Sequence, residues 1–502
     1  METQRLLLGI DVGTTHCKAA LFAEDGGLLR QAKTNTPRYE EDGFEYFDPK
    51  RLSEGIVALI REAVTPAEAR HVACVGVTSM AETGLLVDAA SGQARSPLLP
   101  WFSPCAKAQS ERMVGEGDPM ERFAATGLRG SFKYGLAKLL WLKERAPDRL
   151  ENAVWLSAAD YAAYGLTGAM ATDYTLAART YAYRIDRKEW DRDWIRHFGL
   201  APALFPEVYP SGMPIGGITK SIENVTGIPE GVPVAIAGHD HVAASVAIGV
   251  TRPGEVMDSI GTAETLLGVF DRRALVQEDW DSGLSFGLHP ANGRLFWMGG
   301  LSASGGSVEW FRTALSDPAL SYEKIIGLLD GTSPEPTGIL YFPYLSGSGA
   351  PMPDPDAKAA FFGITSRHRQ ADLLKAVLEG TAYEMEAIRR SAARIAGTPI
   401  DRTVVTGGGV RNRHWLQIKA NVSGSRIRLP DEPETALLGA ALLAGIGCGI
   451  YANMEQALEV AAGRRNETIV EPQNDIHESY RAIYERVYMP LQQPLRQYSK
   501  II

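Results

Sequence analysis

A strand, a tight turn of small residues and a returning strand occur twice in this chain, about half a chain apart. In the first copy, residues 6–22, an apolar run ends at Asp11, passes through the turn Gly13-Thr14-Thr15 and returns in a second apolar run. A looser copy, residues 255–270, turns at Gly261-Thr262. Apolar runs bounded by glycine and small polar residues are typical of β-hairpins. Two such hairpins with hydroxyl-bearing turns predict two halves that hold one phosphate chain between them.

The length of the chain and one short connection predict two domains. At 502 residues the chain is longer than a single hydrophobic core usually supports, so we expect two or three domains. The segment Thr251-Arg252-Pro253-Gly254 is short, turn-forming and directly precedes the second hairpin. We therefore place the boundary there, with an N-terminal domain at residues 1–250 and a C-terminal domain at residues 251–502.

Net charge and cysteine usage disfavour several classes of protein. A net charge of −9 argues against a nucleic-acid binder, which usually carries a basic face. The four cysteines are scattered without CxxC spacing, which is typical of free thiols in a reducing compartment. The first residues lack the pattern of a signal peptide, and no run of about 18 apolar residues would span a membrane. We expect a cytoplasmic protein without nucleic-acid or membrane partners, and a homodimer is left open.

Local patterning predicts an α/β arrangement with mixed sheets. Apolar runs separated by glycine-rich turns predict strands, and apolar residues three and four apart predict amphipathic helices. On this basis we expect strands at residues 6–11, 17–23, 28–34, 72–77, 234–237 and 403–406, and helices at residues 49–63, 134–144 and 372–396. A hairpin followed by a strand, a helix and a strand favours a sheet with both parallel and antiparallel neighbours.

The first turn has the composition of an anion-binding loop. Gly13 tolerates the backbone conformations that point N–H groups at one anion, and the small Thr14 and Thr15 allow close approach. Asp11 is placed where a metal ion that accompanies phosphates would need a carboxylate. Lys18, on the returning strand, could reach a terminal phosphate as a point charge. The alternative is a plain β-hairpin, but the repeat of the turn in the second half favours a phosphate site.

A third glycine-rich turn, Gly407-Gly408-Gly409, separates the strand at residues 403–406 from a helix that follows Asn412. Three glycines there let a flat ring or a phosphate lie against bare backbone. The alternative is a βα loop with a close helix–strand contact. The segment is neither a GxGxxG fingerprint nor a Walker A lysine motif, which argues against Rossmann and P-loop nucleotide sites.

A carboxylate follows the strand at residues 234–237, in the segment Gly238-His239-Asp240-His241. A carboxylate at a strand end beside a phosphate site is placed to accept a proton from a substrate hydroxyl, so Asp240 is the candidate catalytic base. Two alternatives stay open. His239, Asp240 and His241 could form a metal site, or Asp240 or its neighbour could cap the helix that follows.

With these elements in order, the chain resembles the FGGY carbohydrate kinases over essentially its whole length. Residues 359–364, followed after seven residues by residues 372–379, are similar to the second signature of that family. Residues 10–15, 341–345 and 439–444 also resemble family motifs. The resemblance implies two RNase-H-like α/β domains, as in actin and the heat-shock chaperone ATPases, around a central cleft. It also implies ATP- and Mg²⁺-dependent phosphorylation of a hydroxyl of a small ketose, polyol or sugar acid.

The resemblance extends to individual positions. Asp240 matches the catalytic base, and Asp11 matches the position that helps to hold Mg²⁺, which with Lys18 would offset charge on the transferred group. The positions that match the phosphate turns and the adenosine site are Gly13, Thr14, Thr15, Gly261 and Thr262, and Gly408, Gly409 and Asn412, respectively.

The residues expected around the sugar depart from the family pattern. Met80-Ala81-Glu82 stands where many ketose kinases carry Gln-Met-His, and Ala81 replaces the arginine of the glycerol-kinase pattern. Trp101 is followed by Phe102-Ser103, without the carboxylate that commonly holds sugar hydroxyls, and residues 347–351 lack a common charged pair. Such losses weaken discrimination between substrates, so either the substrate is atypical or specificity is relaxed. The residues expected to contact the substrate are Met80, Ala81, Glu82, Trp101, Asp240 and His241.

Two other functions compete with a kinase. One is an ATPase of the actin or chaperone type, in which nucleotide hydrolysis serves binding or regulation. The other is a weakly active kinase homologue that binds sugar and nucleotide. The signature at residues 372–379 and the candidate base Asp240 favour an active carbohydrate kinase.

Overall fold

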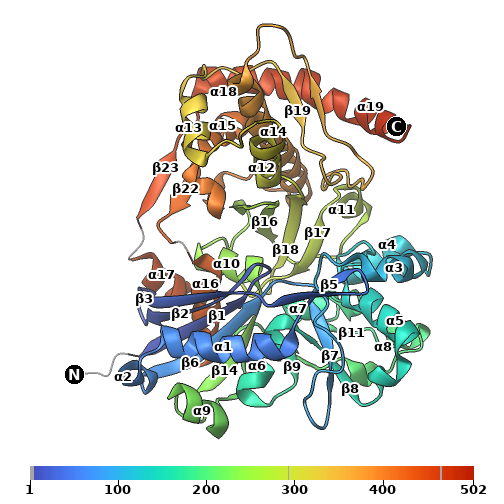
Figure 1. Cartoon of the computed structure of the whole chain (residues 1–502), viewed down its shortest axis with the longest axis vertical. Coiled ribbons are helices and arrows are strands. Elements are labelled where there is room, and N and C mark those ends of the chain that lie inside the picture. The colour runs from blue at the N-terminus through green and yellow to red at the C-terminus, as the bar shows by residue number, and fades with distance from the viewer. Residues whose placement is uncertain (1–4, 292, 433, 464–465, 502) are drawn as a thin grey trace.

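Two mixed β-sheets, one in each half of the chain, form the framework of the molecule (Figure 1). The computed structural model describes residues 5–291, 293–432, 434–463 and 466–501. The strands of the first sheet, in spatial order, are β13 (Pro214–Gly217), β14 (Pro233–His239), β6 (Val72–Ser79), β1 (Leu6–Val12), β2 (His16–Ala23) and β3 (Leu28–Asn35). Those of the second are β17 (Ser285–Leu288), β18 (Leu295–Leu301), β16 (Glu264–Phe270), β15 (Glu255–Ile260), β21 (Arg402–Thr406), β22 (Ile427–Pro430) and β23 (Glu467–Val470).

The centres of the two sheets repeat one local pattern. β1 runs antiparallel to β2 and parallel to β6, with Asp11 opposite Lys18. β15 runs antiparallel to β16 and parallel to β21, with Ser259 opposite Thr265. In both hairpins the turn begins two residues after Asp11 or Ser259. The repeated hairpin and the α/β fold class expected from the sequence are therefore confirmed.

Helices surround both sheets. In the first half they are α1 (Pro49–Ala63), α2 (Pro66–Ala69), α3 (Lys107–Val114), α4 (Pro119–Thr126), α5 (Gly135–Arg145), α6 (Ala158–Thr167), α7 (Tyr174–Ala178), α8 (Arg192–His197), α9 (Lys220–Thr226) and α10 (Asp240–Ala247). In the second half they are α11 (Gln277–Asp281), α12 (Gly305–Ala314), α13 (Tyr322–Asp330), α14 (Gln370–Ala396), α15 (Arg413–Ser423), α16 (Thr435–Gly447), α17 (Met454–Ala462), α18 (Asn474–Ile483) and α19 (Met489–Ser499). Within the described ranges, no helix combines the length and the apolar character needed to cross a membrane.

One face of each sheet is buried by helices of its own half. α1 buries Leu52 and Ile56 against Ile10 and Val12 of the first sheet, and α6 adds Leu166 to the same core. The long helix α14 serves the second sheet, where its buried side chains pack with residues of β15, β16 and β21. Because apolar side chains at helical spacing lie on one helix face, α1 forms over residues 49–63, the range that the spacing predicted.

The other face of each sheet is covered by a helix from the opposite half. α16, from the second half, packs Leu437 and Leu442 against Leu7 of the first sheet. α10, from the first half, packs Val242 against Met257 of the second sheet. The two helices lie side by side between the sheets (Figure 1). We keep residues 251–254 as the proposed boundary, with α16 as the element that packs across it.

Residues 104–205 form a further helical lobe beside the first sheet (Figure 1). Its core joins α3, α5 and α8 through apolar side chains that include Met113, Leu139 and Ile195. The small antiparallel sheet of β7 (Gly84–Asp88) and β8 (Ala153–Ser157) lies between the two cores: Leu85 and Leu156 pack with the first sheet, and Leu86 and Trp155 pack with the lobe. The lobe therefore borders the segments at Met80–Glu82 and Trp101, where the sequence places the substrate.

Candidate active site

Asp11 presents an enclosed carboxylate oxygen at the end of β1. Its Oδ1 atom is buried and has no hydrogen-bond partner. Burial, together with the nearby charge of Asp240, raises the pKa of Asp11 to about 8, although Lys18 opposes the shift. Buried polar atoms in native proteins are nearly always partnered, and a carboxylate oxygen is the ligand type that Mg²⁺ prefers. The residue present therefore fits a metal ion.

Lys18, opposite Asp11, is paired with a residue from the other half of the chain. Its Nζ donates a hydrogen bond to Glu434 Oε2 at 2.7 Å. Glu434 is the N-cap residue of α16, the helix that crosses to the first sheet. The ammonium that the sequence assigned to a terminal phosphate is therefore held by a carboxylate in this structure.

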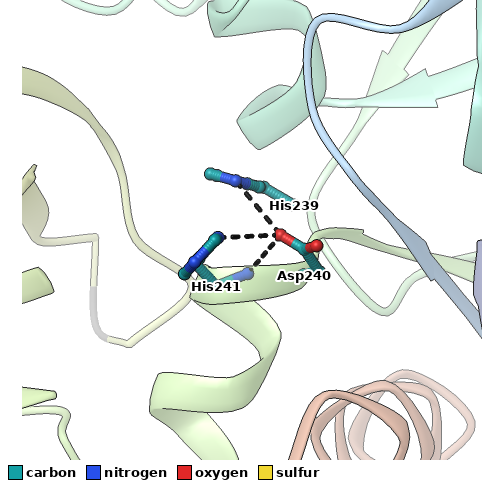
Figure 2. A group of neighbouring side chains, drawn as sticks. All are labelled: His239, Asp240 and His241. Carbon is teal, nitrogen blue, oxygen red and sulfur yellow. Dashed lines mark hydrogen bonds and ion pairs between the residues drawn. The ribbon is translucent and has the colours of Figure 1, made fainter. Parts of the chain in front are cut away.

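Asp240 is the first residue of α10 and accepts hydrogen bonds on one oxygen (Figure 2). Its Oδ1 is 2.7 Å from the backbone N and 3.0 Å from the Nδ1 of His241, and 3.2 Å from the Nε2 of His239. Figure 2 shows these contacts converging on Oδ1, while the second oxygen points away from both imidazoles. One oxygen is thus fixed in place and the other is turned away from its neighbours.

The two histidines keep Asp240 ionised. Burial by itself would raise the pKa of Asp240, but the charge and hydrogen bonds of His241 and His239 outweigh burial, and the pKa lies below its ordinary value. In turn, burial would lower the pKa of His241, but Asp240 outweighs it and the pKa of His241 is raised. A carboxylate at a helix N-terminus gains further from the helix dipole.

Both alternatives for Asp240 stay open. Its neighbour His239 is the N-cap residue of α10 but makes no side-chain capping hydrogen bond, whereas Asp240 Oδ1 accepts from the first-turn backbone N of His241. The candidate ligand atoms of His239, Asp240 and His241 lie within 4.8 Å of one another, so a metal site there is compatible with the geometry.

The end of β14 is fixed by a glycine that no other residue could replace. Gly238 has φ +90°, and a Cβ atom there would lie 2.1 Å from Thr175 Oγ1 and 2.6 Å from Asp173 Oδ2. Thr175 Oγ1 in turn accepts a hydrogen bond from the backbone N of His239 at 2.9 Å. α7 thereby sets the direction in which the chain delivers His239 and Asp240.

Glu82, between β6 and β7, forms a buried ion pair that the sequence did not predict. Its Oε1 accepts a hydrogen bond from Arg179 Nε at 2.6 Å. Burial would raise the pKa of Glu82, but Arg179 and then His239 lower it below its ordinary value. Arg179 Nη1 and His239 Nδ1 are both buried without a hydrogen-bond partner. An unused guanidinium donor and an unpartnered ring nitrogen beside a carboxylate are the arrangement expected where a hydroxylated ligand binds.

Trp101 connects the expected substrate segment to the first turn. Its Nε1 donates a hydrogen bond to Thr14 Oγ1 at 2.9 Å, and that hydroxyl contacts Met80 Sδ at 3.4 Å. Lys133 lies over the indole ring, 5.3 Å from its centroid. Met80 and Ala81 are buried in the first core. The side chain of Thr14 is therefore engaged by the expected substrate segment, and its carbonyl accepts a hydrogen bond from Arg38 at 2.6 Å, so its backbone N–H is the group that stays available to the turn.

The second turn is backed by the N-terminus of α12. The backbone N atoms of Gly305 and Gly306 donate to the carbonyls of Gly261 (3.1 Å) and Thr262 (3.0 Å). A Cβ atom on Gly305 would lie 2.4 Å from Gly261 O, so the close approach requires glycine. Gly261 and Thr262 themselves are exposed.

The triglycine turn lies against the second hairpin. A Cβ atom on Gly409 would lie 2.3 Å from Ile260 Cγ2, whereas one on Gly408 would meet no atom within 4 Å. Asn412 is the N-cap of α15 and accepts from the backbone N of Trp415 at 3.2 Å. The alternative interpretation of this loop, a close contact with a strand, therefore applies to Gly409. Gly408 is exposed and its backbone is not covered by other atoms.

The structure gathers the predicted residues into two groups. The first contains Asp11, Thr14, Lys18, Met80, Ala81, Glu82, Trp101, Asp240 and His241; the second contains Gly261, Thr262, Gly408, Gly409 and Asn412. Gly13 and Thr15 complete the first turn and both accept hydrogen bonds from Thr36. Sequence reasoning missed Glu434 and Arg179. Glu434 precedes a family-like motif and Arg179 is the C-cap residue of the short helix α7, but neither position alone indicates a contact across the chain.

Family models account for most of the chain. The model described as the FGGY family of carbohydrate kinases, N-terminal domain, matches residues 6–247, and the C-terminal domain of the same family matches residues 260–448. Among curated proteins, a xylulose kinase of Bacillus subtilis is 26% identical over 91% of both chains. A glycerol kinase of Saccharolobus islandicus is 26% identical over 90% of both chains.

Solved structures share the same fold. A gluconate kinase from Lactobacillus acidophilus superposes with a TM-score of 0.89 at 19% identity, covering 99% of this chain and 100% of that one. A xylulose kinase from Rhodospirillum rubrum gives a TM-score of 0.88 at 23% identity, covering 99% and 100%. At these identities the likeness concerns the arrangement of the two α/β domains.

Proposed function

Given that this chain belongs to the FGGY family of carbohydrate kinases, we propose that it transfers the terminal phosphoryl group of ATP to a hydroxyl of a small ketose, polyol or sugar acid. The products are the sugar phosphate and ADP. The observation that carries the proposal is the presence of two carboxylates with different environments at one site. Asp240 is held ionised by two histidines, and the nearby Asp11 has an enclosed oxygen without a hydrogen-bond partner.

Asp240 would act as the base in this reaction. Its Oδ1 is held by His239 and His241, so the other oxygen is the one that can accept a hydrogen bond from the acceptor hydroxyl. Phosphoryl transfer depends mainly on positioning and charge neutralisation. A carboxylate of lowered pKa would therefore orient the hydroxyl and take its proton late, as the bond to phosphorus forms.

Asp11 would hold Mg²⁺, which when bound supplies positive charge to the phosphates of ATP. The backbones of Gly13 to Thr15 and of Gly261 and Thr262 would bind the phosphate chain. Gly408 would offer its bare backbone to the adenine or ribose. Lys18 is held by Glu434, so we propose that it is released from this carboxylate or shared with it when nucleotide binds.

The acceptor would lie against Glu82, Arg179 and Trp101. The carboxylate of Glu82 can accept a hydrogen bond from a sugar hydroxyl, and Arg179 Nη1 and His239 Nδ1 are buried nitrogens without partners. A ligand that carries several hydroxyls would therefore satisfy all three groups. Buried polar groups left unpaired by the wrong ligand are the source of selectivity at such sites.

The test measures ADP release from ATP and Mg²⁺ with D-xylulose, glycerol or gluconate as acceptor, and without acceptor. We expect release to depend on one acceptor, and Asp240→Asn to lower kcat by about 10²–10⁴-fold while the thermal midpoint is kept. Acceptor-independent release would instead indicate an ATPase of the chaperone type. Binding of ATP and sugar with negligible release would indicate a weakly active homologue, and unchanged turnover in Asp240→Asn would overturn the assignment of the base.

A further inference from the structure

Lys138 is a buried lysine whose ammonium group lies between two loops of the proposed acceptor site. It projects from α5 and none of its surface is exposed. Its Nζ donates hydrogen bonds to the backbone carbonyls of Glu82 (2.6 Å), Pro100 (2.8 Å) and Leu99 (3.3 Å). Burial lowers the pKa of Lys138 to about 7. In its protonated form the side chain has three N–H donors and no acceptor, so the three carbonyls satisfy it completely.

The three carbonyls belong to loops that carry different parts of the acceptor site. One loop, residues 80–83, presents Glu82 to Arg179. The other, residues 99–102, presents Trp101 to Thr14. Thr83 Oγ1 also links them, because it accepts a hydrogen bond from the backbone N of Trp101 at 3.0 Å. A single ammonium group therefore ties together the two loops from which the acceptor would be contacted.

Lys138 also contacts the most strained residue of the first loop. Glu82 has φ +58°, the left-handed region, which costs a non-glycine residue about 1–2 kcal/mol. Such conformations persist where the surrounding structure fixes them. The carbonyl of Glu82 accepts the shortest of the three hydrogen bonds of Lys138, so the lysine holds this residue in the conformation that directs its carboxylate to Arg179.

We propose that Lys138 is a positioning residue that fixes the separation and orientation of the Glu82 and Trp101 loops for the acceptor sugar. This inference rests on the proposed function. Packing alone does not call for a lysine, because Leu136, Leu139 and Trp141 of α5 already fill the core of the helical lobe. A buried charge is unfavourable unless it is fully hydrogen-bonded. The polar role of Lys138 toward the loops accounts for its presence there.

The test compares Lys138→Met with Lys143→Met on the same helix. Lys143 Nζ also clamps two backbone carbonyls, those of Phe198 (2.8 Å) and Gly199 (2.9 Å), but neither belongs to the two acceptor loops. The acceptor is the most active of D-xylulose, glycerol and gluconate. The readouts are KM for this acceptor, KM for ATP, acceptor-independent ATP hydrolysis and the thermal midpoint.

We expect Lys138→Met to raise the acceptor KM by at least about tenfold, since loop displacements near 1 Å have effects of this order or more. Its KM for ATP and its acceptor-independent hydrolysis should stay within about twofold of wild type. Lys143→Met should leave all three kinetic values unchanged. A normal acceptor KM in folded Lys138→Met, or an equal rise in both KM values, would overturn the role of Lys138.

If Lys138→Met does not fold, Lys138→Arg carries the test. The longer planar guanidinium cannot reproduce the three contacts of a compact ammonium, so the acceptor KM should rise by roughly threefold or more with the KM for ATP unchanged. An unchanged acceptor KM would overturn the proposal. If wild type itself releases no ADP with any acceptor, the proposed function is wrong, and that outcome is separate from any effect of Lys138.

Discussion

The hairpins β1–β2 and β15–β16 share a backbone pattern but carry their charges on opposite faces. In the first, Asp11 and Lys18 face α16, whose N-cap Glu434 pairs with Lys18. In the second, the matching positions are the uncharged Ser259 and Thr265, and the charges sit one residue away. Successive side chains of a strand point to opposite faces of the sheet. Asp258 and Glu264 each precede the matching position by one residue, so their side chains point into the core of the second half.

Those second-hairpin charges form a buried ionic cluster. Lys419 of α15 contacts Asp258 at 3.0 Å and also Glu264, and Ser304 donates to Glu264. All four residues are buried. Each hairpin leaves one buried carboxylate oxygen without a hydrogen-bond partner, Asp11 Oδ1 and Asp258 Oδ1. The hairpins differ in their cation, because Lys419 bonds to the other oxygen of Asp258, whereas the ammonium group of Lys18 bonds to Glu434. Both halves keep the same hairpin backbone, and we propose metal binding at the first hairpin alone, because the carboxylate of Asp258 in the second already has Lys419 as its counter-ion.

The largest effect is expected on stability, from a substitution in the ionic cluster of the second hairpin. Lys419→Met leaves Asp258 and Glu264 buried without a cation, and removal of one partner of a buried pair costs about 3–5 kcal/mol of unfolding free energy. Denaturant unfolding measures the loss, and the KM values of the remaining folded enzyme should not change. The double variant Asp258→Asn/Lys419→Met should recover part of the loss; an unaffected single variant would contradict the comparison.

Next in size is a loss of activity at the first hairpin. Asp11→Asn removes the proposed metal ligand and should lower kcat by roughly two orders of magnitude, with a higher Mg²⁺ requirement and no loss of stability. The matched control is Ser259→Ala, at the same position of the second hairpin, which should change kcat by less than about twofold. Equal effects of the two substitutions on kcat would break the comparison.

A smaller effect concerns pH and Mg²⁺. The pKa values of Asp11 and Glu264 are both raised to about 8, first by burial and then by a neighbouring aspartate. The unfolded chain releases these protons near pH 4, so each group stabilises the fold in full below that pH and loses its contribution as pH rises through about 8. Thermal midpoints without Mg²⁺ should therefore fall toward pH 8, and less so in Asp11→Asn or Glu264→Gln.

Mg²⁺ separates the two hairpins in this experiment. A ligand that binds only the folded state raises stability, so Mg²⁺ at pH 8 should raise the midpoint of wild type and of Glu264→Gln, but not that of Asp11→Asn. A Mg²⁺ response that survives in Asp11→Asn would place the metal elsewhere, with His239, Asp240 and His241 as the next candidates.

The smallest effect on stability is expected for Lys18→Met. The pair of Lys18 and Glu434 is partly exposed, so its loss should change the unfolding free energy by less than about 1 kcal/mol. If Lys18 meets phosphate, its removal raises the KM for ATP, whereas Glu434→Gln frees the ammonium and lowers it. The same direction of change in both variants would show that the pair acts only as a link to α16.

The parts of this molecule set by local sequence were predictable. The turn at Gly13 to Thr15, the helix at residues 49–63 and the placement of Asp240 at a strand end all follow from spacing within a few residues. Contacts across the chain were not predictable, because Lys18 and Glu434 are 416 positions apart and Glu82 and Arg179 are 97 apart. A lone arginine or glutamate carries no periodic pattern that would indicate its partner.

The exchange of α10 and α16 makes the two halves of the chain interdependent. A break in the polypeptide near residue 252 would leave the first sheet without α16, exposing Leu7 and its apolar neighbours, and would leave the second sheet without α10. Each fragment would lack the helix that covers one face of its sheet, so the two fragments would have to be expressed together to yield folded protein. The same interlocking confines any movement between the halves to the contact where the two exchanged helices meet.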